Sequence, residues 1–587
     1  MSISHILNRK NLLFSLAFIV LNVILILPSQ LLPVKTPSIL KASSGFRMLF
    51  THIWVSVDLL IIITIIFFIR KQNKFRLLKW VLITIFLFVF SYELYEIIIL
   101  LFYRRSPVLY NDIMLFLDGF NLFIALIPEK WPFMLLLTMI FGLLFFWLIP
   151  LLFSYLKNQF SQVYNSKFMW ALILFIWITV LFFHLENGIT ERDTATQFIL
   201  GRFSKNISLS TDLYNELKTI QKMEPDSSYH KLDQLMLDKK PNIYIFFIES
   251  YGKILATRDE YRDTYADYLY DIEQRLKEDG WDMRSNYSAP PVRGGASWLS
   301  ASSMLGGIRL ENVRLYHRYN SRQNPNMVQF FNKLGYTTIK LQPANRERPG
   351  RPLSNYFGFD IALSFDDMNY HGTQYGWTSV PDQYSIHYTH KHYLSIQKNP
   401  ILLFFPTVSS HAPWTHLPDY HQNWETIGMP DSVREISSAK NESFFTAIVK
   451  KIANIFKRKW TRPVHTGNYL KLMFYELRIL DEFIRTKIPD NSLVVILGDH
   501  QPPLLLNDED TEDTPIHILS KNRDLINLFN NYGFVEGLFK NPLSDDIIKH
   551  EAIFSLLVNV LFDYNYPDKT DSVDYYLKDG ISISLLK

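Results

Sequence analysis

Long apolar segments recur through the first third of this 587-residue chain. A helix needs about 20 mainly apolar residues to cross the hydrocarbon core of a bilayer. Segments that approach this length lie at residues 11–33, 51–69, 80–103, 131–156 and 168–185. The first follows Arg9 and Lys10 as a signal peptide would, but no small-residue cleavage site follows it. We therefore predict a helical membrane bundle of five spans over residues 1–186.

The basic residues between these segments predict the orientation of the bundle. The connection between the second and third segments is the most basic one, with Arg70, Lys71, Lys74, Arg76 and Lys79. The positive-inside rule places this connection in the cytoplasm. Because the number of predicted spans is odd, the rest of the chain then lies outside. We expect a multi-pass protein of the cell membrane, with a helical stalk at 187–240 and an extracytoplasmic domain at 241–587.

Three acidic residues fall within the predicted spans, namely Asp58, Glu93 and Glu96. Ionisable groups are costly in a membrane and by default indicate a function or a partner within the bundle. Glu93 and Glu96 are three residues apart and would share one helix face. We favour a position near the outer interface, or pairing within the bundle, over an ion pathway.

The composition excludes several classes of function. The chain contains no cysteine, so disulfides, thiolate metal sites and cysteine nucleophiles are all absent. The 60 basic residues are nearly balanced by 56 acidic ones, for a formal net charge of +4. This small excess does not indicate binding to nucleic acid.

The outer part of the chain contains short, continuous apolar runs that are typical of strands buried on both faces of a parallel sheet. They are PNIYIFFIESYG (241–252), YTTIKL (336–341), PILLFFPT (400–407) and NSLVVILGDH (491–500). Helical patterns alternate with these runs. Strands that alternate with helices predict an α/β domain.

Residues that follow the predicted strands are rich in oxygen and imidazole ligands. Glu249 follows the first run, His411 follows the third, and Asp499 and His500 end the last. Open α/β sheets bind ligands beyond the carboxyl ends of their strands. Carboxylate and imidazole groups gathered there predict a site for a divalent metal ion.

A run of small residues, VRGGASWLSASSMLGG (292–307), contains a candidate nucleophile. The two glycines before Ser297 would let the backbone approach a ligand closely. The helical pattern after Ser297 would direct a helix N-terminus at an anion. A serine hydroxyl needs a base or a metal to become a good nucleophile, and the predicted metal site would supply it. Ser300, Ser302 and Ser303 are expected to cap or pack the helix instead.

Three motifs together carry a family resemblance. They are IFFIESYG with its Glu249, SWLSASSMLGG from Ser297 to Gly307, and the Gly-Asp-His sequence at 498–500. In this order they resemble the sulfatase and alkaline-phosphatase superfamily. They are most similar to its membrane-anchored branch of lipoteichoic acid synthases, phosphoglycerol transferases and phosphoethanolamine transferases. The resemblance covers about 240–560, and the five predicted spans match the same architecture.

The resemblance implies a sulfatase-like α/β domain that binds one divalent cation. The implied ligands are Glu249, Ser297, Asp499 and His500, a set that suits either Mn²⁺ or Zn²⁺. It further implies that Ser297 is the nucleophile and that His411, in FFPTVSSHAPW, contacts the substrate phosphate.

Further residues are expected to line the substrate pocket. Trp414 lies near His411, and QYGWTSVPDQ resembles a family segment that points to Trp377 and Asp382, although both are equally compatible with ordinary loop positions. Family members carry a histidine after the second apolar run. In its place this chain offers Arg346, Arg348 and Arg351, which would bind phosphate in a bidentate way or lie in a solvated loop.

The resulting hypothesis is a metal-dependent transfer of a phosphoglycerol or phosphoethanolamine group. The donor would be a membrane phospholipid, and the acceptor a glycan, polymer or glycolipid of the cell envelope. Sulfatases convert their nucleophile to formylglycine within a motif that has an arginine four residues on, where this chain has Ala301. Alternative functions are a membrane-anchored phosphodiesterase or sulfuric ester hydrolase, or a non-catalytic sensor or scaffold.

A basic amphipathic segment, FFTAIVKKIANIFKRKW (444–460), lies within the outer domain. Its apolar residues recur at helical spacing between lysines and arginines. Such a helix binds well to an anionic membrane surface. The alternative is a helix that packs against its own domain.

Overall fold

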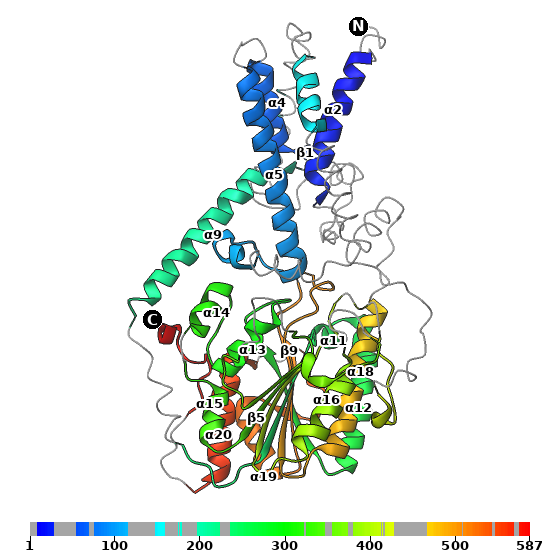
Figure 1. The fold of residues 1–587 in the computed structure, drawn as a ribbon, viewed down its shortest axis with the longest axis vertical. Helices are drawn as coiled ribbons and strands as arrows, with labels where there is room; N and C mark the ends of the chain where they lie inside the picture. The colour runs from blue at the N-terminus through cyan, green and yellow to red at the C-terminus, as the bar shows by residue number, and fades with distance from the viewer. Residues whose placement is uncertain are drawn as a thin grey trace. The chain divides into compact units, whose positions relative to one another are not determined.

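The chain, seen in a computed structural model, divides into two compact units (Figure 1). One unit contains Met1–Leu101 and Arg105–Asn215, and the other Phe102–Arg104 and Glu216–Lys587. The structure describes residues 9–28, 55–69, 75–115, 147–158, 174, 177–178, 196–223, 235–321, 324–346, 355–373, 380–412, 414, 417–427, 466–507, 509–542, 546–568 and 575–586. The division falls within the segment predicted as a stalk, whose boundaries stay a prediction.

The first unit is helical. Its helices include α2 (Arg9–Ile26), α4 (Val57–Ile69), α5 (Phe75–Tyr103) and α9 (Ile199–Ile220). Among the described residues, the stretch Leu77–Leu100 is the one helix long and apolar enough to cross a membrane, whereas Leu16–Ile26 and Val57–Phe68 are shorter apolar helices. The predicted span at 80–103 therefore coincides with a helix of spanning length. The five-span arrangement stays a prediction, because the segments at 131–156 and 168–185 lie mostly outside the described residues.

The acidic residues of the predicted spans pair within this unit. Arg202 of α9 forms ion pairs with Glu93 and with Glu96 of α5, the latter at 2.9 Å between Nε and Oε2. The carboxylate of Asp58 accepts the N–H groups of the first two residues of α9, at 2.7 and 3.0 Å. A carboxylate at this position accepts hydrogen bonds from the free N–H groups and interacts favourably with the positive end of the helix dipole. The arrangement agrees with the interpretation that these acids pair inside the bundle.

The second unit is built on a mixed sheet with the strand order β10-β4-β9-β8-β3-β7-β5-β6, in which β11 also pairs with β4. The strands are β3 (Asn242–Ile248), β4 (Asp282–Ala289), β5 (Thr337–Gln342), β6 (Ile361–Ser364), β7 (Ile401–Pro406), β8 (Ser492–Gly498), β9 (Thr514–Ser520), β10 (Val535–Glu536) and β11 (Ile547–Lys549). The four predicted strands form its centre. β3 runs parallel to β7 and β8, and β5 runs parallel to β7.

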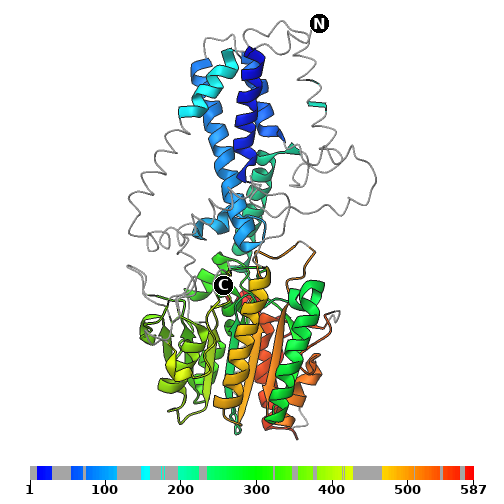
Figure 2. The same ribbon diagram turned by 90° about the vertical axis from the view of Figure 1, so that its right-hand side faces the viewer.

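Helices cover both faces of the sheet because successive side chains of its strands point in opposite directions. Along β3, Ile243, Ile245 and Phe247 belong to one core, and Tyr244, Phe246 and Ile248 to the other. The first core also contains residues of α13 (Ser297–Gly306), α14 (Val313–Asn320), α15 (Met327–Lys333), α19 (Arg523–Asn527) and α20 (Ile553–Asn565). The second contains residues of α11 (Ile254–Thr257), α12 (Asp259–Glu278), α16 (Asp382–Thr389) and α18 (Thr466–Lys487). Figure 2 shows this second layer, with α12 in green and α18 in orange-yellow.

Candidate active site

The carboxyl ends of β3 and β8 bring three candidate metal ligands together. Ile248 pairs with Gly498 at the ends of these parallel strands, so Glu249 lies beside Asp499 and His500. All three residues are buried, and each offers a ligand atom within 4.8 Å of those of the other two. The motifs at 241–252 and 491–500 therefore meet in space, although about 250 residues separate them in the sequence.

Hydrogen bonds orient the side chains of this cluster. Oδ1 of Asp499 accepts the N–H groups of Ser250 and His500, at 2.7 and 2.6 Å, which leaves Oδ2 facing His500 Nε2 at 3.3 Å. Nδ1 of His500 lies 2.8 Å from the carbonyl oxygen of Gln501. A carbonyl can only accept, so Nδ1 carries the proton and Nε2 presents its lone pair. This is the tautomer in which Nε2 can bind a metal ion.

Ser297 completes the cluster from the first turn of α13. Its Oγ donates to Glu249 Oε2 at 3.0 Å and lies 3.1 Å from His500 Nε2. The chain reaches this position through Gly295, at φ +64°, and Ala296, at φ +58°. Ala296 is one of five described non-glycine residues with positive φ, and two of the others, Ser250 and Trp414, also adjoin the site. Backbone conformations of this kind are costly and tend to concentrate at functional sites.

The charges of the cluster fit a divalent cation. Burial, and then the neighbouring carboxylate of Glu249, raise the pKa of Asp499 well above its usual value. Burial lowers the pKa of His500, so its imidazole is neutral. Two carboxylates, an imidazole lone pair and a hydroxyl oxygen thus converge without a positive charge among them. Both Mn²⁺ and Zn²⁺ accept such ligands, and the choice between them stays a prediction.

His411 lies in the loop after β7, at the same edge of the sheet. Ser410 ties this loop to β3, because its Oγ donates to the carbonyl oxygen of Glu249 at 2.7 Å. Burial alone would raise the pKa of Glu249, but the influence of His411, then of His500 in its protonated form, and hydrogen bonds with Asp499 and Ser250 outweigh burial and lower that pKa. His411 Nδ1 lies 2.6 Å from the carbonyl oxygen of Ala412. Its Nε2 is therefore the atom that can exchange a proton with a substrate.

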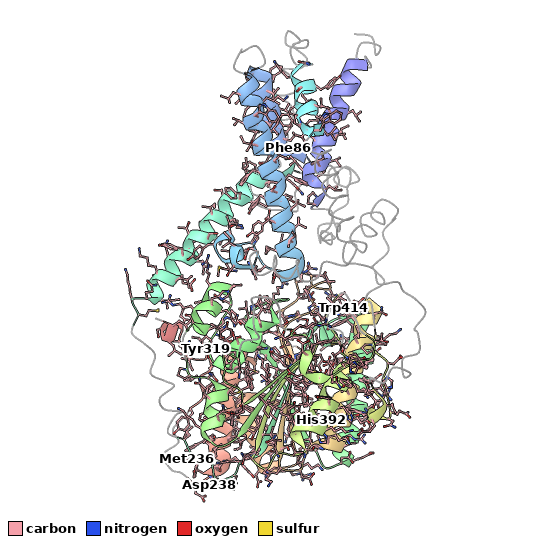
Figure 3. All side chains as sticks on the ribbon, in the orientation of Figure 1. Phe86, Met236, Asp238, Tyr319, His392 and Trp414 are labelled. Carbon is pink, nitrogen blue, oxygen red and sulfur yellow. The ribbon has the colours of Figure 1, made fainter. Side chains whose placement is uncertain are left out.

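Trp414 and Asp382 are both buried. They were candidates to line a substrate pocket, with an ordinary loop position as the alternative for Asp382, and their exposed fractions are 1% and 0%. Trp414 donates from Nε1 to the carbonyl oxygen of Ser410 at 2.8 Å and packs against Tyr469, beside α18 (Figure 3). Asp382 accepts backbone N–H groups of the loop between β7 and His411. Both residues support this loop from beneath and have no surface for a substrate.

Of the three arginines predicted to bind phosphate or to lie in a solvated loop, Arg346 is the one within the described residues. It is exposed, and its guanidinium lies 3.6 Å above the ring of Phe365. Arg348, Arg351 and Trp377 lie outside the described residues, as does the amphipathic segment at 444–460. Their roles stay predictions.

Two buried residues that sequence reasoning missed support the site. His550 Nε2 donates to the carbonyl oxygen of Gly498 at 3.0 Å, and so holds the end of β8 in front of Asp499. Glu476 of α18 is 1% exposed and lies behind the loop of His411. Glu476 has a signal in the sequence, because it occupies a position where helical spacing predicts an apolar residue, between Met473 and Leu480.

A family model for sulfatases matches residues 260–530. The match includes Ser297, His411, Asp499 and His500, in the order that the resemblance requires, and Glu249 lies just before it. The chain therefore contains a sulfatase-like α/β domain. No curated protein matches the sequence.

Several solved structures are similar to the sulfatase domain and its surroundings. The lipoteichoic acid synthase LtaP from Listeria monocytogenes is 15% identical, with 61% of this chain and 81% of that chain covered and a TM-score of 0.35. The C-terminal periplasmic domain of EptC from Escherichia coli is 12% identical, with 61% and 96% covered and a TM-score of 0.33. The Streptococcus pyogenes phosphoglycerol transferase GacH in complex with sn-glycerol-1-phosphate is 13% identical, with 61% and 87% covered and a TM-score of 0.30.

Proposed function

We propose that the protein transfers a phosphoglycerol or phosphoethanolamine group from a membrane phospholipid to a hydroxyl group outside the cytoplasm. The acceptor belongs to a glycan, polymer or glycolipid of the cell envelope. One phosphodiester is exchanged for another through a covalent ester on Ser297. Diacylglycerol leaves in the first step, and the acceptor takes up the phospho-group in the second.

The position of Ser297 Oγ carries this proposal. It lies 3.0 Å from Glu249 Oε2 and 3.1 Å from His500 Nε2, so the hydroxyl adjoins two of the candidate metal ligands. A divalent cation bound by these ligands and Asp499 would lower the cost of the serine alkoxide and offset the charge of the phosphate. Two features support a donor that is confined to the bilayer. The sequence motifs resemble those of the membrane-anchored transferases named above, and Leu77–Leu100 forms a helix of spanning length.

The residues of the chain account for each proton. In the first step a bond forms between Ser297 Oγ and phosphorus, and the bond from phosphorus to the diacylglycerol oxygen breaks. Glu249 Oε2 accepts the serine proton, and protonated His411 gives its Nε2 proton to the departing oxygen. In the second step the acceptor hydroxyl attacks phosphorus and gives its proton to His411. The bond to Ser297 breaks, and the serine recovers its proton from Glu249.

Water in place of the acceptor would make the same residues a phosphodiesterase. A sulfuric ester hydrolase of the sulfatase type fits less well, because the formylglycine motif lacks its arginine at Ala301. An unmodified serine that attacks phosphorus agrees better with the hydroxyl contacts of Ser297.

Mass spectrometry of the peptide that contains Ser297 tests the proposal. The full chain is incubated with vesicles of phosphatidylglycerol or phosphatidylethanolamine, quenched in acid and digested. We expect the added mass of phosphoglycerol or phosphoethanolamine on Ser297. Ser297→Ala should lose the adduct and reduce lipid turnover by about 10⁴-fold or more.

Ser300→Ala is the matched control, since Ser300 lies one helical turn further along α13 and its side chain is fully buried. This variant should keep the adduct. Lipid turnover without any adduct on Ser297, or an adduct at another residue, would contradict the mechanism. Release of free head-group phosphate in the presence of acceptor would identify the hydrolase instead.

A further inference from the structure

Two buried carboxyl groups meet behind the loop that carries His411. Asp382 is the first residue of α16, and Glu476 lies in the middle of α18. Their exposed fractions are 0% and 1%. Each has oxygens without a hydrogen bond of normal geometry among the described residues, namely Oδ1 of Asp382 and both oxygens of Glu476, although the backbone N–H of Ser410 lies near Glu476. Because ionised carboxylates only accept, two such groups in contact cannot hydrogen-bond unless one of them carries a proton.

The second oxygen of Asp382 holds the loop. Oδ2 accepts the N–H groups of Val408 at 2.8 Å and Ser409 at 2.5 Å. In return, the Oγ of Ser409 accepts the N–H group of Asp382 at 3.0 Å. The next residue, Ser410, donates to the backbone of Glu249. The position of His411 therefore depends on a chain of contacts that begins at the Asp382 carboxylate.

We propose that Asp382 and Glu476 share one proton, and that this protonated pair positions the loop of His411 for the reaction. Glu476 carries the proton and donates it to Oδ1 of Asp382, which leaves Oδ2 charged for the two loop N–H groups. Both are positioning residues, because they act through the loop and do not touch the reacting atoms. The role in the reaction rests on the proposed function, whereas the shared proton does not.

The surroundings favour the neutral form of Glu476. Burial, followed by the charge of Asp382, raises the pKa of Glu476 well above its usual value, and burial also raises the pKa of Asp382. Among the described residues, the charged groups with the largest influence on Glu476 are Asp382 of α16 and Glu249 at the end of β3, and both are acidic. The backbone N–H of Ser410 acts in the opposite direction and lowers the pKa. With negative charges on these sides, a second ionised carboxylate is disfavoured.

Loss of the shared proton gives the pair its pH dependence. Above the pKa of Glu476 two buried carboxylates face each other, which should push α18 away from Asp382 and loosen the loop. Because the folded-state pKa is raised, the native chain binds more protons than the unfolded chain above about pH 4.3. The contribution of this pair to stability is thus greatest at low pH and falls as pH rises towards the raised pKa.

The decisive variant is Glu476→Gln, whose amide can donate to Asp382 at every pH. The measurement is kcat for transfer or hydrolysis of a soluble phosphodiester by the full chain, across the pH range in which the protein stays folded. We expect wild-type kcat to fall on the alkaline side with the slope of a single proton, at most about tenfold per pH unit. Glu476→Gln should move this fall upward by at least one pH unit, to the fall that loss of the His411 proton causes in the proposed mechanism. KM should change much less than kcat.

The matched control is Glu482→Gln, on the same helix but partly exposed to solvent. It should reproduce the wild-type pH profile. Asp382→Asn offers a second test, because the asparagine oxygen can accept from the loop while its amide donates to ionised Glu476. It should also move the alkaline fall upward. The proposal would be overturned if kcat fell at the same alkaline pH in wild type and in Glu476→Gln. It would also be overturned if Glu482→Gln moved this fall as far as Glu476→Gln does.

Hydrogen exchange of the loop separates this inference from the proposed function. The backbone N–H groups of Val408 and Ser409 should lose protection at alkaline pH in wild type and keep it in Glu476→Gln, after correction for intrinsic exchange rates. The N–H groups of β3 serve as the internal reference. If the loop behaves in this way but no substrate reacts, the proposed function fails and the shared proton stands. Equal protection in the two proteins would refute the shared proton itself.

Discussion

Ser297 is distinguished from its neighbouring serines by what its oxygen can reach. Ser297 is partly exposed and contacts Glu249 and His500. The Oγ of Ser300 is buried and has no hydrogen-bond partner among the described residues. One turn of helix thus separates a hydroxyl beside two candidate metal ligands from one that is buried without a hydrogen-bond partner among the described residues. The choice between them depends on the direction of α13, which the strained Ala296 sets at its start.

Asp499→Asn provides a test of the charge balance at the site. The asparagine oxygen can still accept from Ser250 and His500, and its amide can donate to His500 Nε2 across the present 3.3 Å separation from Oδ2. The substitution also removes an ionisable carboxyl group that is buried beside Glu249. We expect the metal-free variant to be more stable than wild type by about 1 kcal/mol, and to gain less stability when metal is added.

Thermal unfolding after chelation, and again with Mn²⁺ or Zn²⁺, measures both effects. Ser297→Ala is the control, since it keeps both carboxylates and should keep most of the metal-induced shift. An Asp499→Asn variant that is less stable without metal, and equally stabilised by metal, would contradict the ligand assignment.

The candidate ligands could be predicted from the sequence because their positions follow from strand geometry and match the motifs that carry the family resemblance. Glu249, Asp499 and His500 come directly after apolar runs, and the ends of parallel strands meet at one edge. Trp414 lies in a loop and Asp382 at the first residue of α16, where local sequence does not determine which way a side chain points. Their burial depends on α18, a helix distant in the sequence. Glu476 was missed for the same reason, since its partner becomes apparent only when α16 and α18 are packed together.

Among the elements, the central strands could be predicted and the outer strands could not. The runs that form β3, β5, β7 and β8 are continuous and apolar because both of their faces are covered. β4 has the sequence DMRSNYSA. Its Ser285, Asn286 and Ser288 are buried, and their side chains form hydrogen bonds with other segments. A polar strand of this kind gives no apolar pattern. Its antiparallel pairing with β9 makes the sheet mixed.

The contact between α5 and α9 leads to a prediction about stability. Arg202 is 5% exposed and is the cation for two buried acids, Glu93 and Glu96. Arg202→Leu should leave both carboxylates without a counter-charge and destabilise the first unit by about 3–5 kcal/mol. The measurement is thermal unfolding of the full chain in detergent.

Lys205→Leu, an exposed position on the same helix, is the control and should change stability little. Replacing Glu93 and Glu96 by leucine together with Arg202 should restore much of the lost stability, because no uncompensated charge would remain. A single Arg202→Leu variant as stable as the control would show that the ion pairs are unimportant.

At the scale of the whole molecule, the predicted topology places everything after residue 186 outside the cytoplasm. A reporter that is active only in the cytoplasm, fused after Lys587, should therefore be silent. The same reporter fused within the basic connection at residues 70–79 should be active, since the positive-inside rule places that connection in the cytoplasm. Activity after Lys587 would contradict the five-span arrangement and remove the basis for a lipid donor.

The position of β3 in the sheet has a consequence for how the chain is made. β3 is the first strand of the sheet to be synthesised, yet it lies between β7 and β8, which end at Pro406 and Gly498. Its apolar sequence, NIYIFFI, therefore emerges from the ribosome long before either partner strand exists. Unpaired apolar strands of this kind are prone to aggregation until their partners arrive. Biogenesis of this domain must therefore shield one of its most apolar strands while some 250 further residues are added.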